Sequence, residues 1–285
     1  MSRTRALLIG NNYVGTDNEL NGCFADVQRM RDVLVSQGCV SADRVVMLLD
    51  ATADQISTAL QSLASASWSE SLTAAYVHYS GHGTQVYDAQ GDEPDGLDEA
   101  ICPIDFAAAG VMTDDFLKRC FGRFNPATTV RFLCDACHSG SMLDLRYTYE
   151  SATSMKDAGV RASMSPRVIM ISGCRDTQTS ADAWDAQLQQ YGGALTDALL
   201  DVIHDDATTR TDVFALLAAL RKRLRATGFT QVPVLSSSFK LASAVPFLSF
   251  APKKKQLVQD SCPTRDVKVN TRKAAAGLRV NVWRR

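Results

Sequence analysis

The 285-residue chain contains no long hydrophobic run. No segment reaches the ~18 uninterrupted apolar residues of a membrane-spanning helix, and the most apolar stretch, 241–251, is short and contains Pro246. The first residues lead at once into a strand-like segment, which leaves no room for a signal peptide, and Ser2 is not the Gly that N-myristoylation requires. We therefore expect a soluble cytoplasmic protein without a transmembrane segment.

Cysteine is not scarce, but the eight cysteines are scattered through a chain that lacks an export signal, which argues against a disulfide framework. Most of them are expected to be small buried hydrophobic residues. The segment from Cys134 to Cys137 is formally a Cys-x-x-Cys motif, which is typical of redox sites at strand-to-helix turns. Because Cys134 still belongs to the apolar run that begins at Val130, redox catalysis is the weaker interpretation.

Strand-like and helical patterns alternate along the chain. The predicted strands are 5–10, 45–49, the segments that lead to His82 and to Cys137, 168–172, and one near 232–237. The predicted helices are those that contain Val27 to Leu34, 52–63, 114–121, 193–204 and 211–228. This alternation predicts an α/β protein with a largely parallel central sheet flanked by helices on both faces.

Two apolar segments end in residues suited to thiolate chemistry, 77–83 and 132–140. A thiol with a pKa of ~8.5 needs a base or a positive environment to become an efficient nucleophile. His82 is the predicted base for Cys137, and the amide N–H groups of Gly83 and Cys137 are the predicted donors to a developing oxyanion. The carboxyl ends of parallel strands are where such side chains meet.

A zinc site is a second interpretation of the same region, since His78 and His82 are four residues apart and Cys134, Cys137 and His138 are close in sequence. The segment around His78 is β-rich, so two residues four apart lie more than ~12 Å from each other on a strand. We therefore interpret His78 as a packing or hydrogen-bonding strand residue. His138 is interpreted as an orienting or turn residue, although an exchange of roles with His82 remains open.

Three separated blocks of this sequence, in the same order, resemble the signature blocks of metacaspases, the caspase-like cysteine peptidases. The blocks are 20–27, 78–83 and 135–141. The resemblance implies the caspase-hemoglobinase fold and a type I-like organisation. It implies a large-subunit-like (p20) part over 1–146 with the His and Cys, a flexible connector over 147–166, and a small-subunit-like (p10) part over 167–250; a basic extension follows over 251–285.

The resemblance also implies a specificity pocket lined by Cys23, Asp26, Ser80 and Asp135. Paired carboxylates in such a pocket select Arg or Lys, and Arg is favoured by its bidentate fork. Without the family match, Asp26 would be interpreted as an ordinary exposed helix residue.

An acidic region runs from Asp88 to Glu99 and is followed by further aspartates. By composition alone it is a solvated acidic loop, and its spacing does not fit an EF-hand. In calcium-dependent metacaspases the ligand positions correspond to Asp98, Asp114, Asp115 and Asp144. The retained acidic set favours Ca²⁺ as an activator.

Basic residues outside the predicted pocket suggest sites of self-cleavage and a charged extension. Lys156, Arg161 and Arg167 are candidate self-cleavage sites. The extension 251–285 carries ten Lys/Arg and two Asp, which favours a solvated extension. Binding to an anionic membrane or nucleic acid, or a pseudosubstrate role, stays open for it.

These features predict a calcium-dependent cysteine endopeptidase that cleaves protein or peptide substrates after Arg or Lys through a thioester on Cys137. His82 has no obvious third member to orient it, so a dyad is predicted. We expect a monomer and no nucleic-acid partner. A non-catalytic calcium-responsive interaction module and a peptide ligase that uses the same thioester are the alternatives.

Overall fold

The computed structural model describes residues 3–88, 91, 96–159, 164–173, 193–205, 208–242 and 244–248. The chain divides into two units, Met1–Ala251 and Pro252–Arg285. The second unit lies outside the described residues, so the predicted basic extension has no structural account here.

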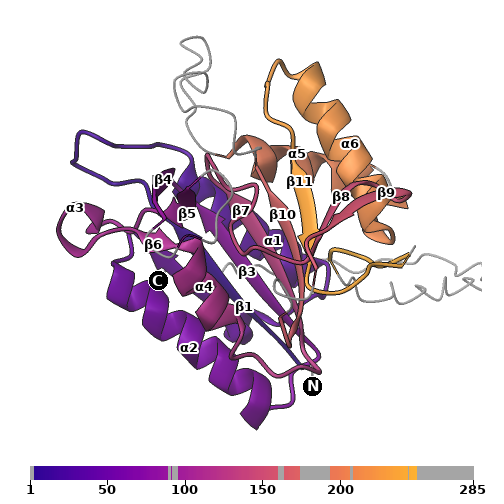
Figure 1. Cartoon of the computed structure of the whole chain (residues 1–285), viewed down its shortest axis with the longest axis horizontal. Helices are drawn as coiled ribbons and strands as arrows, with labels where there is room; N and C mark the ends of the chain where they lie inside the picture. The colour runs from indigo at the N-terminus through magenta and orange to yellow at the C-terminus, as the bar shows by residue number, and fades with distance from the viewer. Residues whose placement is uncertain are drawn as a thin grey trace, which may run out of the picture. The chain divides into compact units, whose positions relative to one another are not determined.

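The first unit is built on an eight-stranded sheet with the strand order β2-β1-β3-β7-β10-β11-β8-β9 (Figure 1). Its five parallel strands are β2 (Val45–Leu49), β1 (Thr4–Gly10), β3 (Ala74–Ser80), β7 (Thr129–Asp135) and β10 (Arg167–Ser172). Three antiparallel strands follow in the order β11 (Val234–Ser237), β8 (Tyr147–Ser151) and β9 (Ser154–Asp157). The predicted largely parallel α/β sheet is confirmed.

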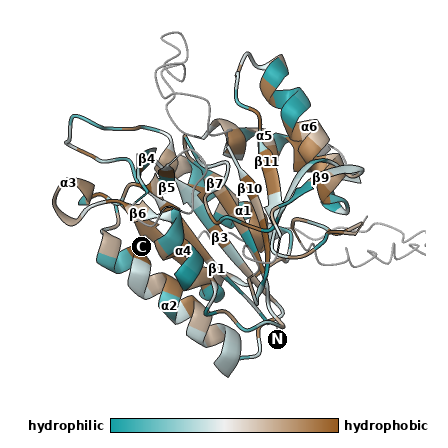
Figure 2. Ribbon diagram, in the orientation of Figure 1, coloured by the Kyte–Doolittle hydropathy of each residue, from teal (hydrophilic) through white to brown (hydrophobic). Residues whose placement is uncertain are grey.

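Helices cover both faces of this sheet, as Figure 1 shows. One face packs against α1 (Cys23–Ser36), α5 (Ala194–Asp205) and α6 (Val213–Ala226). The other packs against α2 (Ala53–Ser69) and α4 (Asp114–Phe121). Hydrophobic residues gather on the central strands between these two layers (Figure 2), because strands buried on both faces carry near-continuous apolar runs.

Local sequence signals determine where several helices begin. The Thr52 side chain accepts a hydrogen bond from the Gln55 N–H, and Gln55 completes the predicted capping box of α2. The Asp212 side chain accepts from the Phe214 N–H and caps α6 as predicted. Helix α4 covers the predicted residues and is capped by Thr113.

A second, three-stranded sheet was not predicted. It consists of β4 (Gly83–Tyr87), β5 (Leu97–Ile101) and β6 (Met112–Thr113), with the short helix α3 (Phe106–Ala109) between β5 and β6. Asp98 and Glu99 of β5 are buried, and so is Asp88. The solvated-loop interpretation of these acidic residues is therefore wrong, because strand pairing and packing bury them.

The predicted connector 147–166 contains ordered strands. Residues 147–157 form β8 and β9, and β8 pairs with β11 through Tyr149 and Leu235. Residues 147–157 therefore belong to the main sheet, and the division into a large-subunit-like part, a connector and a small-subunit-like part stays a prediction. Short single turns, η1 (Ala42–Arg44) and η4 (Thr208–Arg210), complete the described elements. None of the helices in the described ranges is long and apolar enough to cross a membrane.

Candidate active site

The two sequence segments that carry the predicted nucleophile and base meet at the carboxyl ends of β3 and β7. These strands are parallel neighbours, and the Gly81 N–H donates to the Asp135 carbonyl across their ends at 3.3 Å. Gly83 lies directly against Cys137: a Cβ built on Gly83 would come within 2.1 Å of the Cys137 carbonyl oxygen. Only glycine fits there, so His82, Gly83 and Cys137 converge on one small region.

His82 has an orienting partner. Its Nε2 lies 2.9 Å from the backbone carbonyl oxygen of Asn18. A carbonyl only accepts, so this contact places the proton of the neutral imidazole on Nε2 and leaves Nδ1 with the lone pair. The sequence analysis did not find this partner. The Asn18 carbonyl is a backbone group 64 positions away from His82 in sequence, and no residue type marks it.

Two buried tyrosines hold the backbone of His82. The His82 N–H donates to the Tyr13 hydroxyl oxygen at 3.0 Å, and the Tyr79 hydroxyl donates to the His82 carbonyl at 2.8 Å. The Tyr13 ring also lies against the imidazole, with centroids 4.7 Å apart. Burial raises the pKa of both phenols, so they stay protonated. Neither tyrosine was predicted as a site residue.

Cys137 is the accessible thiol among the described cysteines. It is partly exposed, whereas the other five, Cys23, Cys39, Cys102, Cys120 and Cys134, are buried, and all six are outside disulfides. Burial raises the pKa of Cys23 to about 12 and those of Cys39 and Cys102 to about 11, which keeps these thiols protonated and inert. Most cysteines are thus buried as predicted; Cys174 and Cys262 lie outside the described residues.

The four predicted pocket residues lie together beside this region. The Ser80 hydroxyl donates to Asp26 Oδ2 at 2.7 Å. Cys23 is close enough to both Asp26 and Asp135 for their charges to raise its pKa further. Asp26 is 1% exposed, so its interpretation as an ordinary exposed helix residue is wrong. Glycine at position 193 is needed here as well, because its φ is +92° and a Cβ would come within 2.6 Å of Asp26 Oδ2.

The two carboxylates of this group disfavour each other's charge. Burial, and after it the charge of the neighbouring Asp26, raises the pKa of Asp135 to about 7, although hydrogen bonds from α5 oppose this shift. Burial also raises the pKa of Asp26, while Ser80 and Arg29 oppose this shift. Arg29 donates to Asp26 Oδ1 at 2.7 Å and also pairs with Asp197. A buried pair of acids with one cation attached is a site that attracts further positive charge.

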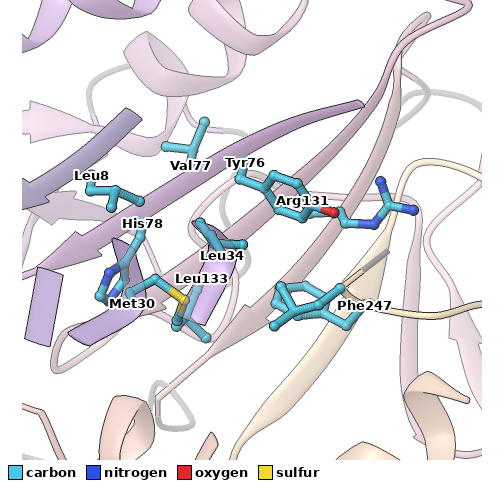
Figure 3. Close-up of a pocket in the computed structure, with 10 residues that line it drawn as sticks. Leu8, Met30, Leu34, Tyr76, Val77, His78, Arg131, Leu133 and Phe247 are labelled. Atoms are coloured by element: carbon cyan, nitrogen blue, oxygen red, sulfur yellow. The ribbon is translucent and has the colours of Figure 1, made fainter. Parts of the chain in front are cut away.

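His78 is a hydrogen-bonding strand residue, as predicted. Its Nε2 lies 3.1 Å from the Thr196 hydroxyl oxygen, and burial lowers its pKa to about 3. Figure 3 shows it beside a cavity that Leu8, Met30 and Leu133 also line. That cavity has a volume of about 10 Å³, enough for about one water molecule. It is therefore not a substrate site.

Comparisons with known proteins agree on one family. A family model described as the caspase domain matches residues 3–242. Metacaspase-1 of Kluyveromyces lactis is 33% identical over 86% of this chain and 68% of its own length. Metacaspase-1A of Neurospora crassa is 34% identical over 83% of this chain and 63% of its own length.

This chain belongs to the metacaspase family. It is accordingly a cysteine-type endopeptidase, a hydrolase with protein substrates. The crystal structure of protein GSU0716 from Geobacter sulfurreducens has a similar fold, with a TM-score of 0.62 and 25% identity over 87% of this chain and 99% of that one. The caspase-like fold predicted from the sequence is confirmed. Both named metacaspases extend beyond the length that this chain covers.

The predicted calcium ligands of this metacaspase lie partly together. Burial, together with the charges of Asp144, Glu99 and Asp98, raises the pKa of Asp114 to about 8. Asp115 lies next to them; its N–H donates to Asp114 Oδ1 at 2.7 Å, and its carboxylate is 3.8 Å from Arg119.

The described residues contain no preformed group of three or more side chains with metal-binding geometry. Residues 92–95 of the acidic segment lie outside the described part.

Two partners of this acidic region were not predicted. Lys118 of α4 lies with its Nζ 3.2 Å from Asp144 Oδ2, so an internal cation pairs with one predicted ligand. Glu99 accepts a hydrogen bond from the Ser141 hydroxyl at 2.6 Å. Ser141 follows the predicted nucleophile Cys137 by four residues, so this bond links the acidic region to the loop that contains Cys137.

Proposed function

We propose that this metacaspase hydrolyses peptide bonds on the carboxyl side of Arg or Lys and that Ca²⁺ activates it. The observation that carries the specificity is the buried pair Asp26 and Asp135, which lies beside the Gly83–Cys137 contact at the ends of β3 and β7. Two carboxylates buried this deeply and close to each other are stabilised when a cation pairs with them. A guanidinium matches it best, because its planar fork can donate to both acids.

The catalytic sequence follows from the tautomer of His82. The Nδ1 lone pair takes the proton of the Cys137 thiol, and the sulfur attacks the scissile carbonyl carbon. The N–H groups of Gly83 and Cys137 are the proposed donors to the oxyanion. The imidazolium then protonates the leaving amine, which leaves a thioester on Cys137. His82 next removes a proton from water, and the resulting hydroxide attacks the thioester carbonyl and expels the Cys137 thiolate with the acid product. The imidazolium then returns its proton and restores the thiol.

The Asn18 carbonyl and the two tyrosines support this role of His82. The hydrogen bond from Nε2–H to the Asn18 carbonyl fixes the orientation of the imidazole ring and leaves Nδ1 free to accept a proton. It also stabilises the imidazolium that forms during the reaction. Tyr13 and Tyr79 restrain the backbone around the base. Such restraint matters because a small misplacement of a catalytic group costs a large part of its effect.

Calcium activation is supported by the donor chemistry of the acidic region. Asp98, Asp114, Asp115 and Asp144 supply the carboxylate oxygens that Ca²⁺ prefers. The pKa of Asp114 is raised by its burial and then by the negative charges of Asp144, Glu99 and Asp98, which a cation would offset. A bound Ca²⁺ would supply that charge and order the loop after the nucleophile. For this, Asp144 has to exchange its contact with Lys118 for the metal.

Paired peptide substrates test the proposal. Fluorogenic peptides that end in Arg, Lys or Asp are incubated with the native protein and with Cys137→Ala, in calcium and in chelator; Cys39→Ala, which removes a buried thiol, is the matched control. Hydrolysis restricted to Arg and Lys, dependent on calcium and lost only in Cys137→Ala, is expected. Mass spectrometry of the products separates hydrolysis from ligation. Folded native protein that cleaves no peptide would favour the non-catalytic interaction module.

A further inference from the structure

Thr196 in the first turn of α5 connects a buried histidine to a buried carboxylate of the proposed pocket. Its backbone N–H and its hydroxyl both donate to Asp135 Oδ2, each at 2.7 Å. The hydroxyl oxygen lies 3.1 Å from His78 Nε2. All three side chains are at most 2% exposed. One chain of hydrogen bonds therefore joins β3, α5 and β7 under the substrate-binding face.

The direction of these hydrogen bonds can be assigned. A threonine hydroxyl has one proton, and a carboxylate oxygen accepts, so the Thr196 proton points to Asp135. His78 must then donate from Nε2 to the Thr196 oxygen. This assignment leaves His78 Nδ1 as an acceptor, and that buried atom has no hydrogen-bond partner among the described residues. His78 stays neutral because burial holds its pKa near 3.

The sheet register places this chain of bonds on the pocket side. His78 and Ser80 are two residues apart on β3 and so share a face, and Ser80 is the register partner of Asp135. Figure 3 shows the His78 side chain on the same side as Leu133, whereas Val77 points to the opposite side. Each pocket carboxylate thus has its own hydroxyl donor, Ser80 for Asp26 and Thr196 for Asp135.

Asp135 requires such support to act on a charged substrate. A buried carboxylate is costly unless several donors satisfy it, and here the N-terminus of α5 supplies N–H groups and the positive end of its dipole. The same bonds restrict rotation of the carboxylate. A fork-to-fork contact with a guanidinium needs both groups to be coplanar, so the orientation of Asp135 decides how well Arg is distinguished from a neutral side chain.

We propose that Thr196, held in place by His78, is a positioning residue for substrate specificity that orients the Asp135 carboxylate toward the basic side chain of the substrate. This inference rests on the proposed function, because it requires that Asp135 binds Arg or Lys. Thr196 lies in the small-subunit-like part and Asp135 in the large-subunit-like part. Recognition of the basic residue therefore depends on contact between α5 and the end of β7.

The test compares Thr196→Val, which loses the hydroxyl but keeps shape and backbone N–H, with Thr196→Ser, which keeps the hydroxyl. Each enzyme is assayed with two matched peptides that end in Arg or in citrulline, the neutral isostere of Arg. The ratio of kcat/KM for the two peptides is the readout. Because both substrates meet the same preparation, the ratio is independent of how much of a variant is folded.

Thr196→Val is expected to lower the Arg-to-citrulline ratio by about tenfold or more, since a hydrogen bond to a charged group is lost, while Thr196→Ser retains most of the preference. In an Asp135→Asn background, Thr196→Val should cause little further change. If Thr196→Val yields no folded protein, Thr196→Ala replaces it.

Equal Arg-to-citrulline ratios for the native enzyme, Thr196→Val and Thr196→Ser would overturn this inference alone. Native enzyme that cleaves peptides without preferring Arg or Lys would overturn the proposed function and this inference with it.

Discussion

The carbonyl oxygen of Cys137 occupies the space that a side chain at Gly83 would need. A Cβ at position 83 would come within 2.1 Å of that oxygen and within 3.0 Å of the Ala136 Cβ. The close approach brings together the backbones of the segments that carry the predicted base and the predicted nucleophile. It explains how two motifs about fifty residues apart in sequence come to lie side by side.

Gly83→Ala should therefore inactivate the enzyme. The substitution must push the Cys137 backbone away, and a displacement near 1 Å at a reacting group costs about 100-fold in rate. Peptide hydrolysis measured as kcat/KM checks this. Gly122→Ala is the matched control, since its Cβ would meet the Lys118 oxygen at 3.2 Å, far less closely. Activity of Gly83→Ala equal to that of the control would contradict the assignment of the site.

The orienting contact of His82 predicts an asymmetry between two variants. Asn18→Ala keeps the backbone carbonyl that accepts from Nε2, so its kcat should change little. Tyr13→Phe removes the acceptor of the His82 N–H, and leaving that group unpaired should lower stability by about 1–3 kcal/mol and reduce kcat. Thermal unfolding and steady-state kinetics measure both effects. A large loss of kcat in Asn18→Ala with none in Tyr13→Phe would contradict the assigned roles of the Asn18 backbone carbonyl and the Tyr13 hydroxyl in holding His82.

The raised pKa of Asp135 predicts a pH-dependent preference for basic substrates. Below about pH 7 the carboxyl gains its proton and no longer attracts a cation, so the Arg-to-citrulline ratio of kcat/KM should rise as pH passes through about 7. Asp135→Asn should remove this rise. A ratio that is constant from pH 5.5 to pH 8.5, a range of about three units around that pKa, would show that Asp135 does not bind the substrate cation.

The same shift predicts the sign of a stability effect. Because the folded pKa of about 7 lies above the ordinary aspartate value of about 3.9, the native state binds the proton more tightly than the unfolded state. The contribution of Asp135 to stability is therefore complete below about pH 4 and declines as the pH rises toward about 7.

The contact between Lys118 and Asp144 predicts how calcium sensitivity can be tuned. If Ca²⁺ competes with the Lys118 ammonium for Asp144, Lys118→Gln should lower the calcium concentration needed for half-maximal activity. Arg123→Gln is the control, because it removes the same positive charge from a residue just after the end of α4. Calcium titrations of peptide hydrolysis measure the difference. An unchanged or weaker calcium response in Lys118→Gln would argue against Asp144 as a ligand.

Local patterns predicted the regular elements well and the supporting contacts poorly. The strands that lead to His82 and Cys137 were identified from apolar runs, and the caps at Thr52 and Asp212 follow from side-chain chemistry next in sequence. Strands β4 to β6 were missed because their residues are mixed in polarity and are buried only after they pair. The Asn18 contact was missed because a carbonyl is present at every residue.

The residues of the proposed pocket also differ in how far the sequence predicted them. Asp26 and Asp135 came from the family resemblance, since nothing in their spacing indicates that α1 brings one beside the other. Thr196 could not be found from sequence, because its proposed role depends on a hydrogen bond to Asp135 across 61 positions that only helix packing creates. The roles of the acidic ligand set and of the basic residues Lys156, Arg161 and Arg167 stay predictions; Arg161 lies outside the described residues.

The most direct test of the central claim is covalent trapping of the nucleophile. The protein is treated with a peptide chloromethyl ketone that ends in Arg, in calcium or in chelator, and the modified residue is located by mass spectrometry; the citrulline analogue is the matched control. One adduct on Cys137, formed with the Arg reagent in calcium and strongly reduced with citrulline or chelator, is the predicted result. An adduct on another cysteine, or equal labelling by both reagents, would contradict an Arg-directed metacaspase site at Cys137.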